Sequence, residues 1–133
     1  MRRIFALLAG LLAVSATQAA SLQDFELNKL LNTVAKQSSV GTPRAINEDI
    51  LDQGYTVEGH RLINHLSVRP AHAAEMRSNP DQVRSQLRAS VCQNPGYRQL
   101  LGKGAELSYV FSELKSNRPV ATERFQASDC GLK

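Results

Sequence analysis

Three histidines are the side chains that most directly offer chemistry, because imidazole binds metals and carries protons. They are His60, His65 and His72, so their spacings are five and seven residues. A zinc site needs ligands one helical turn apart, or ligands that converge from neighbouring strands together with a fourth group. On a strand, residues five apart point to opposite faces, which disfavours a metal shared by His60 and His65. We therefore expect no bound metal.

Acidic side chains form a second group at Glu48, Asp49 and Asp52. A calcium loop would need alternating oxygen ligands, a central glycine and a terminal glutamate, and this stretch lacks that pattern. We interpret the group as the solvated edge of a strand, where charge discourages aggregation.

Motifs of nucleophilic catalysis are missing from the sequence. It contains no Gly-x-Ser-x-Gly elbow, no phosphate-cradling glycine loop and no His-Glu-x-x-His helix. We predict that the protein is not an enzyme and uses no cofactor. A catalytic triad is recognised by geometry and not by sequence position, so a secreted enzyme remains an alternative.

Arginines give the strongest local charge feature of the chain. Arg84 and Arg88 are one helical turn apart and can present adjacent guanidinium groups to a carboxylate, a phosphate or an acidic protein surface. Arginine and tyrosine dominate binding hot spots, so we predict an interaction surface there. The alternative is an ordinary solvated helix face. The predicted surface consists of Arg84, Arg88, Tyr97 and Arg98, and the wider basic cluster adds Arg69 and Arg77.

The first twenty residues have the features of a secretory signal peptide. Arg2 and Arg3 are followed by an apolar run over residues 4–14 and small residues before position 20. The run is too short for a stable membrane anchor, and no cysteine stands at the junction to carry a lipid. We predict a signal peptide over residues 1–20, one exported domain over residues 21–133, and a periplasmic or secreted destination.

The remaining chain is only mildly basic. The formal charge of +4 falls to +2 when Arg2 and Arg3 are removed with the signal peptide. The chain has no tryptophan and no alternation of aromatic and basic residues, so we do not expect nucleic-acid binding.

Two cysteines, Cys92 and Cys130, lie in the predicted exported part. Export into an oxidising compartment makes a disulfide between them the simplest interpretation. A catalytic thiol is the competing hypothesis, although the chain has no Cys-x-x-Cys pair.

An amphipathic helix is predicted first, from Ser21 to about Ser38, because apolar residues recur there at helical spacing. Ser21 and Asp24 form a weak capping box, and Gly41 and Pro43 follow the helix end. We expect this helix to pack on the core; docking to a membrane surface or a partner is the alternative.

Two hairpins are predicted from alternating apolar residues, one over residues 44–69 with a turn at Glu58-Gly59, the other over residues 105–125. Gly54 predicts a bulge in the first. Between the hairpins, prolines mark helix starts at positions 70, 80 and 95, with Asn79 and Asn94 as predicted caps. This order predicts a four-stranded, mainly antiparallel sheet built from two hairpins and covered by helices.

The region from Arg69 to Cys130 also carries a family resemblance. It resembles the small exported Pseudomonas proteins classed as quorum-sensing-regulated virulence factors, over the whole mature chain. The resemblance implies an α/β/α sandwich, export, a link to cell density, and no assigned active site. The residues that carry it are Cys92, Asn94-Pro95, Arg98, Leu100-Leu101, Gly104-Ala105, Tyr109, Phe111 and Cys130.

These features together predict a non-enzymatic protein-interaction module, an adaptor or a chaperone-like protein with an envelope or secreted protein as partner. The alternatives are a small-ligand carrier, which requires an apolar cavity with a few converging polar groups, and a secreted enzyme.

Overall fold

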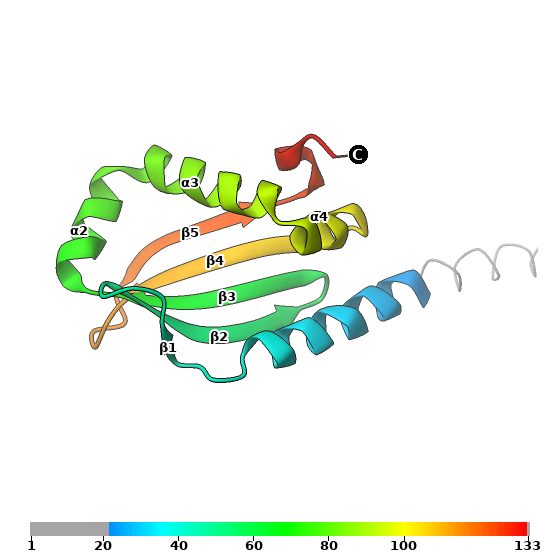
Figure 1. The fold of residues 1–133 in the computed structure, drawn as a ribbon, viewed down its shortest axis with the longest axis horizontal. Helices are drawn as coiled ribbons and strands as arrows, with labels where there is room; N and C mark the ends of the chain where they lie inside the picture. Colours follow the sequence, from blue (N-terminus) through cyan, green and yellow to red (C-terminus); the bar gives the residue numbers. More distant parts are fainter. Residues whose placement is uncertain (1–21, 133) are drawn as a thin grey trace, which may run out of the picture.

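The computed structural model describes residues 22–132, and the predicted signal peptide lies outside them. An N-terminal helix over residues 22–38 comes first, and three further helices separate two pairs of strands (Figure 1). The elements in order are β1 (Arg44–Ala45), β2 (Ile50–Glu58), β3 (Arg61–Val68), α2 (Pro70–Ser78), α3 (Pro80–Gln93), α4 (Pro95–Gly102), β4 (Glu106–Glu113), β5 (Pro119–Phe125) and the 3-10 helix η1 (Ala127–Cys130).

The strands form one five-stranded sheet in the order β1-β2-β3-β4-β5. Both predicted hairpins are present, as β2–β3 and β4–β5. The predicted strand number is wrong by one, because β1 pairs with β2 over only two residues, too few to show a period. β3 and β4 are parallel, whereas the other neighbours are antiparallel. A parallel pair needs a long crossover, and α2, α3 and α4 supply it.

All the helices pack against the same face of the sheet. In register across three strands, Leu62, Leu107 and Phe125 form one apolar row. Leu31 of the N-terminal helix and Leu101 of α4 are buried against that row. Residues 22–132 therefore form two layers, and the three layers of the α/β/α sandwich that the resemblance implies are not found among them. The face of β3 that no helix covers carries Arg61, Ile63, His65 and Ser67, so three of its four side chains are polar.

A bulge at Gly54 bends β2, as the sequence predicts. The register with β3 shifts between Asp52 and Gly54, and Gly54 has a φ of +110°. A Cβ atom at this position would lie 3.1 Å from Thr42 Oγ1 and 3.2 Å from Ser39 Oγ. Only glycine fits this turn of the strand beside the chain that follows the N-terminal helix.

Helix starts agree with the proline positions, because each proline occupies the first turn where its missing N–H costs nothing. Asn94 caps α4, since its side chain accepts a hydrogen bond from Tyr97 N at 3.1 Å. Asn79 occupies the predicted N-cap position of α3, but its side chain makes no capping hydrogen bond, because its amide donates backward to Glu75 O at 2.9 Å. In the described part of the chain, no helix combines the length and the apolar character that a bilayer crossing requires.

Candidate functional site

A partly open groove of about 370 Å³ lies between α2, α3 and the covered face of the sheet. Its floor comes from Ile50 of β2 and Phe111 of β4, beside Met76 of α2. Val83 and Leu87 of α3 form its apolar wall. Phe111 and Met76 are buried, whereas the other three side chains are half-buried and available for contact. The groove therefore exposes apolar side chains of β2 and α3 above the buried Met76 and Phe111.

Side-chain amides form one rim of the groove. Asn79, Gln82 and Gln86 line it, and all three are exposed. An amide offers both donors and acceptors, so it can bind backbone or side-chain groups of a bound molecule without imposing a charge.

The end of the groove at α2 is acidic. His72 Nδ1 lies 3.8 Å from Glu75 Oε2 and 3.9 Å from Asp49 Oδ2. The side chains of Glu75 and Asp49 are 77% and 42% exposed. Within residues 22–132, neither carboxylate has a lysine or arginine nitrogen within 4.0 Å. Their negative charge is therefore available to a bound molecule.

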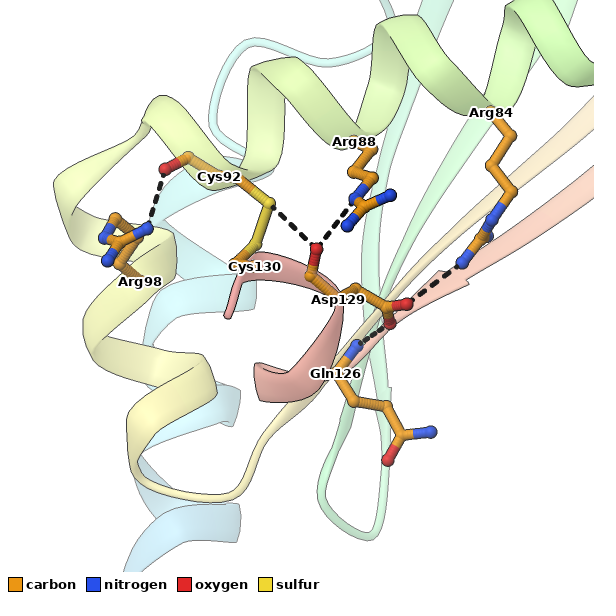
Figure 2. The surroundings of a disulfide bond; sticks show 7 residues. All are labelled: Arg84, Arg88, Cys92, Arg98, Gln126, Asp129 and Cys130. Carbon is orange, nitrogen blue, oxygen red and sulfur yellow. Dashed lines mark hydrogen bonds and ion pairs between the residues drawn. A yellow bond between two sulfur atoms is a disulfide. The ribbon is translucent and has the colours of Figure 1, made fainter. Parts of the chain in front are cut away.

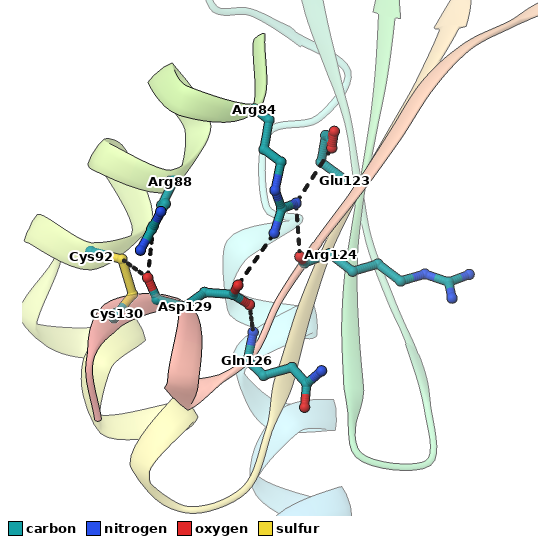
Figure 3. Close-up of polar contacts among 8 residues, drawn as sticks. All are labelled: Arg84, Arg88, Cys92, Glu123, Arg124, Gln126, Asp129 and Cys130. Carbon is teal, nitrogen blue, oxygen red and sulfur yellow. Dashed lines mark hydrogen bonds and ion pairs between the residues drawn. A yellow bond between two sulfur atoms is a disulfide. The ribbon is translucent and has the colours of Figure 1, made fainter. Parts of the chain in front are cut away.

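α3 contacts different parts of the molecule on two sides: one side lines the groove, and the other contacts β5 and η1. On the side away from the groove, the Arg84 guanidinium lies 3.3 Å from Asp129 Oδ1 and 3.5 Å from Glu123 Oε2 (Figure 3). It also donates to Arg124 O at 3.2 Å, and its Cζ lies 4.6 Å from the centre of the Phe125 ring. Arg84 thus ties α3 to β5 and η1.

The disulfide between Cys92 and Cys130 makes a second tie between α3 and η1 (Figure 2). Beside it, Arg88 Nε donates to Asp129 O at 2.7 Å, and Arg98 Nη1 donates to Cys92 O at 3.1 Å. We call the contacts of Arg84, Arg88 and the disulfide with η1 the C-terminal lock. The lock fixes the helix that forms one wall of the groove.

The predicted interaction surface lies apart from the groove. Arg84, Arg88 and Arg98 bind groups of their own chain through the contacts above, and Tyr97 OH lies 3.5 Å from Tyr55 OH. None of these four residues lines the groove. That they bind a partner stays a prediction, and the exposed Arg88 and Arg98 keep part of each guanidinium free for it.

Local sequence patterns do not reveal the groove. Val83 and Leu87 lie one helical turn apart on α3, but Ile50 and Phe111, which complete the lining, are distant from them in the chain. The available signal is that the amides of Gln82 and Gln86 flank the apolar Val83 and Leu87 along one side of α3.

The acidic and histidine groups of the sequence separate in the fold. Asp52 is buried, so its interpretation as part of a solvated edge is wrong: its Oδ1 accepts from Gly54 N and Asn64 Nδ2, each at 2.9 Å. His65 Nε2 lies 2.6 Å from Thr56 Oγ1 on the uncovered sheet face, whereas His72 lines the groove on the covered side. Among residues 22–132, no three His, Cys, Asp or Glu side chains gather as a metal site requires.

Two tyrosines beside Tyr97 are held in their neutral form. Burial, followed by the hydrogen bond with Tyr97, raises the pKa of Tyr55 well above its ordinary range. Burial, followed by the charge of Tyr97, raises the pKa of Tyr109 in the same direction. The folded protein therefore keeps two protons that the unfolded chain releases above about pH 10.

Alkaline pH is expected to destabilise the protein through these groups. Above about pH 10 the unfolded state binds fewer protons than the folded state, so the free energy of unfolding falls as pH rises. The check is the melting temperature across this range, with Tyr55→Phe and Tyr109→Phe expected to flatten the fall. A wild-type melting temperature that does not change above pH 10 would contradict the account.

Comparisons with known proteins agree with this fold. A crystal structure of a "putative secreted protein" from Pseudomonas aeruginosa is 73% identical, with a TM-score of 0.80, and the match covers 82% of this chain and 96% of that one. The pilotin EpsS of the Vibrio vulnificus type 2 secretion system has a TM-score of 0.72 at 12% identity, over 85% of this chain and 99% of its own. The type II secretion pilotin AspS of Vibrio cholerae has a TM-score of 0.69 at 16% identity, over 84% and 99%.

These two pilotins share the fold with this chain, and at such identities the likeness extends no further than the fold. A search of curated proteins finds no match. The family model described as "Putative quorum-sensing-regulated virulence factor" matches residues 20–131. This match spans nearly the whole chain, so the protein belongs to the family that carries this description.

Proposed function

We propose that this protein is a non-enzymatic interaction module, exported by its signal peptide, that binds a segment of another envelope or secreted protein in the groove between α2 and α3. The observation that carries the proposal is the half-buried apolar surface of Ile50, Val83 and Leu87, which folding leaves uncovered. Covering such surface is favourable by about 25 cal/mol per Å² of apolar area. An adaptor or chaperone-like role follows from this binding.

The shape and lining of the groove favour a protein segment over a small ligand. A carrier encloses most of its ligand's surface, whereas this groove is open along one side and is rimmed by the exposed amides of Gln82 and Gln86. The fold likeness to two pilotins of type II secretion systems supports a role beside other envelope proteins.

The test compares two double variants of α3 that carry the same added charge. Gln82→Arg/Gln86→Arg places two arginines on the groove rim, whereas Ser85→Arg/Ala89→Arg places them on exposed positions outside the groove. Oxidised mature protein is crosslinked in its native envelope and culture supernatant, and captured proteins are identified by mass spectrometry.

We expect the wild type and the Ser85→Arg/Ala89→Arg control to capture the same stoichiometric partner. The groove variant Gln82→Arg/Gln86→Arg should capture at least tenfold less of it. All four positions are exposed, so the free energy of unfolding of both variants should lie within about 0.5 kcal/mol of the wild-type value. Equal capture by the two variants would show that the partner does not bind in the groove. The surface of Arg88 and Arg98 would then be the candidate binding site.

A further inference from the structure

The groove side of α3 has the residue spacing of a helix-packing surface. Asn79, Gln82, Val83, Gln86 and Leu87 line the groove at intervals of three and four residues. Such rows of side chains form the ridges and grooves into which a second helix packs. The row runs over nine residues, from the N-cap Asn79 to Leu87, and rises about 12 Å, which is about two helical turns.

The helical layer over the sheet is incomplete at this place. The N-terminal helix and α4 cover the Leu62 and Leu107 end of the sheet, and α3 runs along β5 (Figure 1). Ile50 and Phe111 lie at the other end, beside α3, and form the floor of the groove. A helix laid along α3 would complete this layer and cover the half-buried Ile50, Val83 and Leu87.

Charge at the end of the groove sets the direction of such a helix. α2 lies across the end of the sheet where α3 begins (Figure 1), and it brings Glu75 to the acidic end beside Asp49. The N-terminus of a helix carries a partial positive charge, which carboxylates stabilise. Lysine or arginine in the first turn of the bound helix would add a charge that is complementary to both carboxylates.

We infer that the groove takes an amphipathic helix of the partner protein, which lies along α3 with a basic first turn against Asp49 and Glu75. The inference rests on the proposed function and adds the secondary structure, direction and charge of the bound segment. Apolar residues at helical spacing on the partner contact Ile50, Val83 and Leu87, and the amides of Gln82 and Gln86 bind its polar flank.

The test uses two synthetic amphipathic peptides of identical composition, each about 15 residues long so that a helix can form. Both carry leucines at helical spacing and blocked termini; one has two lysines in its first turn and the other has them in its last turn. Binding to the oxidised mature protein is measured by fluorescence anisotropy.

We expect the peptide with lysines in the first turn to bind about threefold to fivefold more tightly. The difference should disappear in about 1 M salt, where charges are screened within about 3 Å. It should also disappear in Asp49→Asn/Glu75→Gln, whereas the matched control Asp24→Asn/Glu26→Gln, on the exposed start of the N-terminal helix, should keep it.

The outcomes separate this inference from the proposed function. If both peptides bind equally and Gln82→Arg/Gln86→Arg blocks both, the groove binds helices but the assigned direction and charge are wrong. If neither peptide binds at millimolar concentration, the helical occupant is wrong, and the capture experiment alone decides on the groove. Tighter binding of the peptide with lysines in its last turn would reverse the assigned direction.

Discussion

Removal of the disulfide is expected to lower the free energy of unfolding by about 4 kcal/mol, because the bridge joins residues separated by 38 positions and restricts the unfolded chain. The free energy of unfolding of native proteins is only about 5–15 kcal/mol, so the double variant Cys92→Ser/Cys130→Ser should lose a large share of its stability. The loss should begin at η1, which contacts α3 and α4 near the bridge.

The measurement is urea denaturation of the oxidised wild type and the double variant. The exposed α3 serines provide a control, since Ser85→Ala/Ser90→Ala should change the free energy of unfolding by no more than about 0.5 kcal/mol. A loss below about 1 kcal/mol for the cysteine variant would show that Arg84 and Arg88 hold η1 without the bridge. The C-terminal lock would then be mainly polar.

Truncation of Phe125 should have an effect of similar size. Its side chain is fully buried, its ring lies edge-on to Tyr109 with centroids 6.2 Å apart, and the Arg84 guanidinium covers it. Phe125→Ala is expected to cost about 3–5 kcal/mol, because it removes buried apolar surface and leaves a cavity between β5, α3 and η1. The cost is measured by urea or thermal denaturation.

Phe25 on the N-terminal helix is the matched control for this substitution. It is the same residue type, but 66% of it is exposed, so Phe25→Ala should change the free energy of unfolding by less than about 0.5 kcal/mol. Equal losses for the two variants would contradict the described core. A small loss for Phe125→Ala would mean that Arg84 and Tyr109 close the cavity.

Local patterns in the sequence predicted most of the elements. The N-terminal helix, the two hairpins, the Gly54 bulge and the proline helix starts each depend on residues within a few positions of one another. The two-residue strand β1 has no such local pattern. Its pairing of Arg44 with Asp52 forms only because the chain turns back on itself between these residues.

Features that depend on distant residues were not predicted. The parallel pairing of β3 with β4 needs the whole crossover from Pro70 to Gly102, and the one-sided helical layer follows from it. The groove likewise joins Ile50 to Leu87 and Phe111, which no local period connects. Contacts of this kind also explain Arg84, which looks like a solvated charge on α3 but binds Glu123 and Asp129 across the fold.

Site-specific photocrosslinking in the native cells tests the groove most directly. A photoreactive amino acid replaces Gln86 on the groove rim, and in separate strains it replaces Ser85 on the outer side of α3 or Thr122 on the uncovered sheet face. We expect one abundant crosslinked partner from position 86, attached through a short apolar segment, and little product from positions 85 and 122. Equal products from all three positions, or a partner crosslinked only from Thr122, would contradict binding in the groove.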